Sequence, residues 1–339
     1  MSEHDAQRRA RLAWGLGLLT LVLLAAGLAA GGDGWSLPAL IDTLQGSDAL
    51  LIVGQIRAPR TLGAWLVGAL LGLAGAIAQG LFRNPLADPY LLGSASGASL
   101  GVVLVLAGSV LAGHGISLAT ADWIARIGLV GAAISGALLG VSLTLLLARG
   151  ARHTLRLLLA GVVVGVMLSA IGDMVTTLAP DALRGKQAFL LGSTGFLSWG
   201  SCAALAVGLL LAGPMAWRLS RLLDALTLGE DSARSLGLAL PRLRLALVVA
   251  LALATGLAVS QAGLIAFVGL VAPHLVRRFA PAPHGYSLLA SAAMGGTLLL
   301  MADVLARSLA APVELPVGVL TAVLGGGYLL WLLHRRALS

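Results

Sequence analysis

The sequence predicts an all-α membrane protein with about ten transmembrane helices and with both chain ends in the cytoplasm. Hydrophobic residues make up 58% of the 339-residue chain, and charged residues only 11%. Apolar runs close to the roughly 20 residues that a helix needs to cross a bilayer recur throughout the chain. The basic residues gather in alternate loops between these runs. Composition and spacing therefore predict a polytopic helical membrane protein.

The apolar runs define ten candidate spans, which we assign to one transmembrane domain over residues 1–339. They lie at about residues 12–30, 61–81, 92–112, 124–148, 155–176, 189–213, 241–260, 262–275, 287–303 and 317–333. The first run could also be read as a signal peptide, because basic residues precede it. It is longer than a usual signal-peptide core, so we interpret it as a span. The eighth run is too short to cross a membrane alone, and we expect a broken or tilted helix there.

The basic residues predict the orientation. With the N-terminus inside, sixteen of the 22 lysines and arginines fall in cytoplasmic loops, as the positive-inside rule requires. The six assigned to the outer side are Arg57, Arg60, Arg126, Arg184, Lys186 and Arg307. Most of the net charge of +8 therefore faces anionic lipid headgroups, and it requires no nucleic acid to explain it.

Small residues at four-residue steps predict close contacts between helices. Such steps occur in three spans, at Ala64, Gly68 and Gly72, at Gly136 and Gly140, and at Gly161 and Gly165. Small side chains on one helix face let two backbones approach each other. We therefore expect a tightly packed bundle.

Several kinds of chemistry are missing from the sequence. The single lysine, Lys186, is not part of a phosphate-binding loop, so any nucleotide hydrolysis would have to come from a partner. No spacing is typical of a metal site or a catalytic nucleophile, which argues against an enzyme. Cys202 is the only cysteine, which excludes an intrachain disulfide. Asp173 and Asp303 lie near span ends, where a hydrated or paired carboxylate is commoner than a proton-relay group.

A polar segment, Leu226–Leu240, interrupts the apolar sequence on the cytoplasmic side. It carries a candidate N-cap, acids in a first helical turn, a base in the last turn and a glycine for the C-terminal cap. These are Thr227 or Gly229, Glu230 and Asp231, Arg234, and Gly237. The pattern predicts a short helix outside the membrane, either a contact surface for a partner or a solvated connector.

Two further segments contain an unusual number of residues that break or start helices. Gly80–Gly97 combines two helix-breaking prolines with small residues that start another helix, which predicts a constrained turn at a helix mouth. Gly263–Arg278 has a similar set of such residues after an apolar run, a weak sign of an internal repeat.

Five motifs in order resemble the permease subunit of type II ABC importers for iron chelates, haem and cobalamin, the FecCD-type family. They are Arg57-Ala-Pro-Arg-Thr61, Gln79–Leu92 with its Arg-Asn-Pro-Leu-Ala-Asp-Pro core, Leu228–Gly237, Gly269-Leu-Val-Ala-Pro-His-Leu275 and Glu314-Leu-Pro-Val-Gly-Val319. The resemblance runs from about Arg57 to Arg335. It implies a bacterial inner-membrane protein that works with a second copy of itself, two ATPase subunits and a periplasmic binding protein. ATP and Mg would be bound by the ATPase, and no cofactor by this chain.

The resemblance also implies roles for individual residues. The polar segment corresponds to the helix that couples the permease to the ATPase: Gly229, Glu230, Asp231, Ala233, Arg234, Leu236 and Gly237. Ala233 and Leu236 are expected to form an apolar stripe there, next to charged residues that fix the position of the partner. Docking of the binding protein is assigned to Arg57, Arg60 and Arg307, for which headgroup anchoring is the alternative. The cytoplasmic gate is assigned to Asn84, His153 and Thr154.

The cargo is predicted from two outer cations. Arg184 and Lys186 precede the sixth span and would favour an anionic cargo, so we expect haem or a ferric siderophore, with cobalamin as the alternative. They would equally suit contact with the binding protein or lipid. A secondary transporter driven by an ion gradient is a further alternative. It is disfavoured because mid-span positions are nearly all apolar or small.

Overall fold

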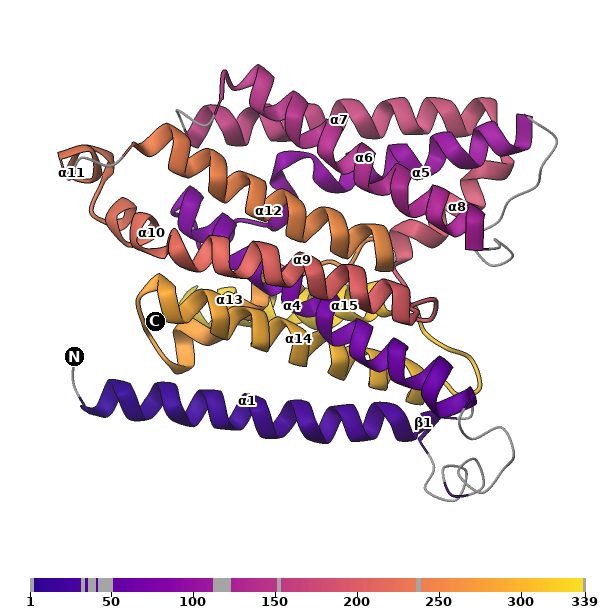
Figure 1. Cartoon of the computed structure of the whole chain (residues 1–339), viewed down its shortest axis with the longest axis horizontal. Helices are drawn as coiled ribbons and strands as arrows, with labels where there is room; N and C mark the ends of the chain where they lie inside the picture. Colours follow the sequence, from indigo (N-terminus) through magenta and orange to yellow (C-terminus); the bar gives the residue numbers. More distant parts are fainter. Residues whose placement is uncertain are drawn as a thin grey trace.

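The computed structural model describes residues 3–31, 34–35, 41, 51–111, 123–150, 154–235 and 239–337. The long helices run along one axis and form a bundle (Figure 1). The start of α1, the end of α15 and the short helices α10 and α11 lie at one end of this bundle. The β1–β2 hairpin and α8 lie at the other end. Both chain ends are thus on the side that carries the polar segment, as the charge pattern predicts.

Each of the ten expected spans contains a helix. These helices are α1 (Glu3–Ala29), α4 (Ala58–Phe82), α5 (Ser94–Leu111), α6 (Trp123–Leu147), α7 (Thr154–Leu178), α9 (Trp199–Arg218), α12 (Leu240–Ala262), α13 (Val268–Phe279), α14 (His284–Ser308) and α15 (Val317–Ala337). The shorter elements are β1 (Ala30–Gly31), β2 (Gly34–Trp35), the π-helix η1 (Ile52–Arg57), the 3₁₀ helix η2 (Pro89–Leu92), α8 (Asp181–Leu191), α10 (Ser220–Thr227) and α11 (Glu230–Ser235). The two strands pair antiparallel, with Ala30 opposite Trp35. Within the described residues, seven helices are long and apolar enough to cross a membrane.

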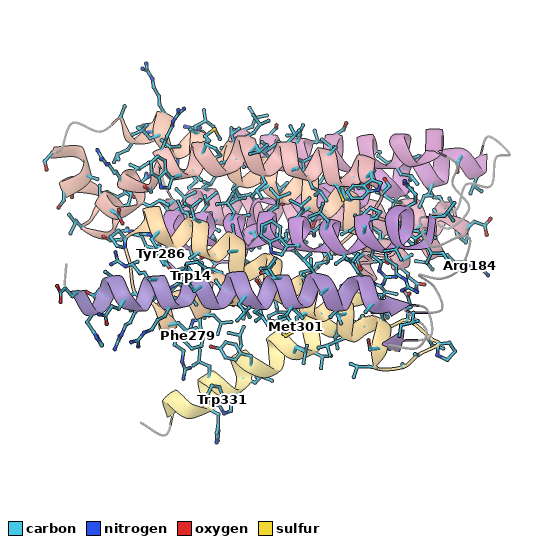
Figure 2. All side chains as sticks on the ribbon, turned by 60° about the horizontal axis from the view of Figure 1, so that its bottom comes forward. Trp14, Arg184, Phe279, Tyr286, Met301 and Trp331 are labelled. Atoms are coloured by element: carbon cyan, nitrogen blue, oxygen red, sulfur yellow. The ribbon has the colours of Figure 1, made fainter. Side chains whose placement is uncertain are left out.

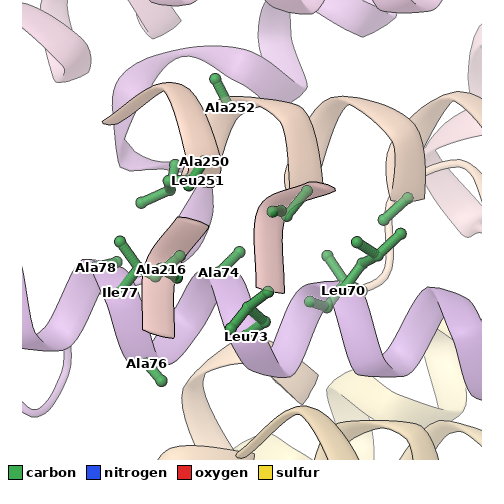
Figure 3. Close-up of a cluster of buried hydrophobic side chains, with 14 of the residues drawn as sticks. Leu70, Leu73, Ala74, Ala76, Ile77, Ala78, Ala216, Ala250, Leu251 and Ala252 are labelled. Atoms are coloured by element: carbon green, nitrogen blue, oxygen red, sulfur yellow. The ribbon is translucent and has the colours of Figure 1, made fainter. Parts of the chain in front are cut away.

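Helix α4 is the centre of the bundle and packs against α9, α12, α13 and α14. Its apolar side chains, among them Leu70, Leu73 and Ile77, belong to the same buried cluster as Ala250 and Leu251 of α12 (Figure 3). A helix that is apolar on all sides is typical of a buried position. The hydrophobic run that predicts this span therefore also explains its place in the core.

The expected small-residue contacts are confirmed. A methyl group added at Gly68 or Gly72 of α4 would overlap the backbone of α14, at Gly295 or Ser291. In the same way, Gly136 of α6 lies against the backbone of α5. Close approach of two backbones is the usual reason for small residues between transmembrane helices.

The sixth span begins later than the sequence predicts. Residues Asp181–Leu191 form a separate helix, α8, and α9 begins only at Trp199. Gly192 has φ +66°, a conformation that glycine adopts without strain, and it ends α8. The apolar pattern alone does not reveal this turn, because apolar residues resume at Phe196 after the short segment Gly192–Gly195.

The eighth span is broken, as expected from its length. Helix α12 ends at Ala262, and α13 begins only at Val268. The end of α12 and the backbone after it bond to the end of α8 and the turn after it: Leu264 N–H donates to Phe189 O (2.9 Å), and Ser193 N–H donates to Ala262 O (2.8 Å). Irregular backbone at membrane depth is tolerated only where protein satisfies its polar groups. The two breaks therefore support each other.

Candidate functional site

The outer end of the bundle holds a cluster of four charged side chains from α4, α14 and the loop before α15. Asp303 is fully buried, and its carboxylate accepts from Arg60 Nε (3.1 Å), from the Thr194 hydroxyl (2.5 Å) and from Arg307 Nη2. Arg60 also donates through Nη1 to Glu314 Oε1 (2.9 Å). Two guanidinium groups and two carboxylates thus balance each other, which is the condition for burying charge at moderate cost.

Two of the outer arginines also bind the end of α1. Arg307 Nη1 donates to the carbonyl oxygens of Gly27 (3.0 Å) and Ala30 (3.2 Å), and Arg57 Nη1 donates to Leu28 O (3.2 Å). The last carbonyls of a helix have no partner within the helix and carry its partial negative charge. Arg57 and Arg307 therefore cap α1 and hold it against α4 and α14.

These contacts correct the expectation for Arg307. Its side chain is only 2% exposed, so it does not present a cation to a docking protein. The side chain of Arg60 is 12% exposed and is shared between two carboxylates. Arg57 is half-buried and binds α1, so the docking role of Arg57 and Arg60 stays a prediction. The Asp303–Arg307 spacing of four residues was a signal for this pairing in the sequence.

At the inner end, α11 forms the expected short helix outside the long spans, and a second short helix, α10, precedes it. Glu230 and Asp231 stand in the first turn of α11, as predicted. Gly229 has φ +107°, which lets the chain turn sharply between α10 and α11. Glu230 Oε1 lies 2.6 Å from Arg244 Nη2 on α12, a side chain that is 3% exposed. An ion pair therefore ties α11 to a long helix of the bundle.

The expected apolar stripe on α11 is not exposed. Ala233 is fully buried in the main hydrophobic core of this chain, so it cannot offer its methyl group to a partner. The residues that α11 and its approach expose are Leu228, Asp231, Ser232 and Ser235. Leu236 and Gly237 lie outside the described residues, and so does the side chain of Arg234. The coupling role of this segment stays a prediction, now carried by its exposed face.

A second contact joins α10 to α14. Asp224 Oδ1 accepts from the backbone N–H of His284 (3.0 Å) and lies 2.7 Å from His284 Nδ1. His284 is the first residue of α14, so the contact is at the N-terminus of that helix, where a carboxylate is favoured. No local pattern in the sequence singles out Asp224, His284 or Arg244, because their partners lie on other helices.

The inner helix mouth is built from the proline-rich turn after α4. Asn84 is exposed, and its side-chain oxygen accepts from Leu86 N–H (2.9 Å), which fixes the turn locally. Asp88 caps η2 by accepting from Tyr90 N–H (2.8 Å), and burial raises the pKa of this carboxyl above its ordinary value. Thr154 is the first residue of α7, and His153 lies outside the described residues. The gate assignment to Asn84, His153 and Thr154 stays a prediction.

The two segments with helix-breaking residues contact each other directly. Gln79 binds α13 at both ends of its amide, donating to Leu270 O (3.1 Å) and accepting from Arg277 Nη2 (2.5 Å). The Tyr90 hydroxyl donates to Ile265 O (3.0 Å) in the break before α13. The two segments with helix-breaking residues thus correspond to two interruptions of the helices, one after α4 and one before α13, that pack against each other.

A groove with a mostly apolar lining and a few polar side chains follows one face of α7. Two adjoining cavities of about 560 and 290 Å³ share Ser96, Ser169 and Asp173 in their walls. Lys186 of α8 lines the smaller cavity and forms an ion pair with Asp173. Lys186 is therefore a neutralised, buried cation. Arg184 is exposed at the opposite end of the bundle from Tyr286, and it lines neither cavity (Figure 2).

Comparison with known proteins agrees with this arrangement. Residues 18–335 match the model of the FecCD transport family. The chain belongs to the FecCD transport family. The vitamin B12 import system permease protein BtuC of Salmonella paratyphi A is 41% identical over 336 residues, which cover 98% of each chain. BtuC of Salmonella typhi is 40% identical over the same length.

Solved structures agree with the fold of this FecCD protein. One, described as "an inward-facing conformation of a putative metal-chelate type ABC transporter", has a TM-score of 0.83 at 28% identity, covering 96% of this chain and 99% of that chain. A second, PsaBC from Streptococcus pneumoniae in complex with Fab, has a TM-score of 0.57 at 18% identity, with coverage of 87% and 94%. The second likeness supports the fold alone.

Membership in the FecCD family establishes the general function. The chain is the permease subunit of an ABC importer and a multi-pass protein of the inner membrane. It is not an enzyme, because ATP hydrolysis in such systems belongs to a separate ATPase. Among the described residues, no three His, Cys, Asp or Glu side chains are grouped as metal ligands.

Proposed function

We propose that this permease imports cobalamin or a related corrinoid. The observation that carries the proposal is its 41% identity to the vitamin B12 permease BtuC over 98% of both chains. The expectation of haem or a siderophore depended on Arg184 and Lys186 as two cations near the entrance. Lys186 is paired with Asp173, and Arg184 lines neither cavity, so the electrostatic argument for an anionic cargo loses its support.

The transporter would contain two copies of this chain, two ATPase subunits that hold ATP and Mg, and a periplasmic binding protein. The exposed face of α11 would contact the ATPase. Its motion would reach α12 through the Glu230–Arg244 pair and α14 through the Asp224–His284 contact. Both helices pack against α4 at the centre of the bundle, so a shift of α10 and α11 would rearrange the core.

The outer cluster would have a different part in the cycle. Because Asp303 and Glu314 balance Arg60 and Arg307, the outer ends of α1, α4 and α14 are held together. A carboxylate of the docking protein would compete with Glu314 for Arg60, since the Glu314 side chain is 41% exposed. Docking would thereby loosen the contact between α4 and the loop before α15.

Uptake into proteoliposomes tests the cargo. The complete transporter, with its ATPase and binding protein, is reconstituted and offered radiolabelled cyanocobalamin, with haemin and a ferric hydroxamate siderophore in parallel. We expect ATP-dependent uptake of cyanocobalamin and no accumulation of the other two. Accumulation of either iron compound without cyanocobalamin would overturn the proposal and restore the iron-chelate prediction.

A further inference from the structure

The groove along α7 is lined by residues that recur at regular steps on one face of that helix. Its lining residues on α7 include Gly161, Gly165, Ser169 and Asp173, which follow one another at four-residue steps. Residues four apart lie above one another on a helix, so these positions form one stripe along the bundle axis. Toward the inner end of α7 the stripe consists of glycines, Gly161 and Gly165, and toward the outer end it consists of the polar residues Ser169 and Asp173. A groove of this shape leaves room for a ligand beside Ser169 and Asp173.

The ion pair at the outer part of the groove is asymmetric. The Lys186 side chain is 10% exposed, whereas that of Asp173 is 71% exposed. The ammonium group is therefore the buried member of the pair, and the carboxylate is the member that is open to the groove. An ionised carboxylate only accepts hydrogen bonds and offers about four lone-pair sites, so one ammonium contact does not exhaust it.

Two serine hydroxyls complete the polar surface. Ser169 donates to Ser96 across the groove (3.1 Å), which joins α7 to α5. A hydroxyl has one donor and two acceptor positions, so this pair can still take a bond from a ligand. The remaining walls include Val162, Val166 and Leu264, which are apolar. A few polar groups on an apolar wall are typical of a small-molecule site.

We propose that Ser96, Ser169, Asp173 and Lys186 form a recognition site for primary amide groups on the rim of the cargo. An amide NH₂ would donate to the Asp173 carboxylate, and its carbonyl oxygen would accept from the serine pair. This inference rests on the proposed function, since the rim of a corrinoid carries several primary amides. A carboxylate on the cargo in place of the amide would lie next to the exposed Asp173 carboxylate, and two negative charges in contact repel each other.

The site predicts opposite effects for the two members of the ion pair. Asp173→Asn removes the charge that repels an acid, so discrimination between amide and acid should fall. Lys186→Gln leaves the Asp173 carboxylate without its cation, so discrimination should rise. A pair with only a structural role would give the two variants effects of the same sign, because each breaks the same contact.

The experiment compares cyanocobalamin with its monocarboxylate derivative, in which one peripheral amide is hydrolysed. Uptake by the complete transporter in proteoliposomes gives kcat/KM for each compound. We expect the wild type to prefer the amide about tenfold, Asp173→Asn about twofold and Lys186→Gln more than tenfold. Asp181→Asn is the matched control, because Asp181 is an exposed acid at the start of α8 that lines neither cavity. We expect it to keep the wild-type ratio.

The two proposals fail in distinguishable ways. If the wild type takes up neither compound, the corrinoid cargo is wrong. If it takes up both but Asp173→Asn keeps the wild-type ratio, or if both variants shift the ratio in the same direction, the recognition site is wrong. ATP hydrolysis stimulated by the binding protein confirms that each variant is assembled. Ser169→Ala supplies a second test that leaves the ion pair intact, and it should lower kcat/KM for both compounds alike.

Discussion

Asp303 balances the charges at the outer end of the bundle, and its replacement is the most direct test of that cluster. Asp303→Asn keeps the shape of the side chain and removes the negative charge that faces two guanidinium groups. Arg307 is 2% exposed and cannot move its charge into water. Breaking a buried ion pair by removing one partner costs about 3–5 kcal/mol, because the remaining charge is left uncompensated.

The local contacts place this variant at the lower end of that range. Arg307 keeps its hydrogen bonds to the carbonyl oxygens of Gly27 and Ala30, and Arg60 keeps Glu314. We therefore expect Asp303→Asn to lower the free energy of unfolding by about 3 kcal/mol. The matched control is Glu314→Gln. It breaks a pair whose carboxylate is 41% exposed, and it should cost at most about 1 kcal/mol.

Equilibrium unfolding in mixed micelles, followed by tryptophan fluorescence, measures both changes. A double-mutant cycle with Arg307→Gln isolates the pair, and we expect a coupling of about 2 kcal/mol, since the two residues are in contact. Equal losses for Asp303→Asn and Glu314→Gln, or strictly additive losses in the cycle, would refute the view that Asp303 compensates buried charge.

Three further predictions concern other parts of the chain. Gly72→Ala should destabilise the protein by about 1–3 kcal/mol or more in the same unfolding assay, because the added methyl group overlaps the α14 backbone. Gly108→Ala, which meets no atom, should not, and equal effects would contradict the packing argument. Arg244→Gln should lower the ATP hydrolysis that the binding protein stimulates, because α11 loses its tie to α12; unchanged stimulation would exclude that route. Since burial raises the pKa of Asp88, the folded state holds its proton more tightly, and stability should fall as the pH rises from about 4 through the raised pKa. Asp88→Asn should remove that slope, and a persistent slope would assign it to other groups.

Much of the architecture follows from the sequence because lipid imposes simple rules on it. Backbone in a bilayer has no water to bond, so apolar runs become helices, and basic loops stay on the cytoplasmic side. The polar segment likewise starts a helix at Glu230, where the turn at Gly229 and the acids of the first helical turn are local features. The family motifs can also be recognised from the sequence, because each of them is short and continuous in the chain.

Apart from the i,i+4 pair Asp303–Arg307, the charged residues of the site have roles that depend on contacts between different segments of the chain. Arg60 meets Asp303 across 243 positions of the chain, and Lys186 of α8 meets Asp173 of α7 across the turn between these two helices. Ala233 is likewise predicted to belong to an exposed apolar stripe, but the packing of α11 against the rest of the bundle buries it.

The sequence by itself determined the membrane class, the orientation and the family, because hydropathy, charge and motifs act over a turn or a span. Only the tertiary structure decided which charges are available to a partner and which are neutralised inside the bundle. Pairing depends on how helices distant in the chain pack and how far they are rotated, and a shift of one residue would turn each of these side chains to another face.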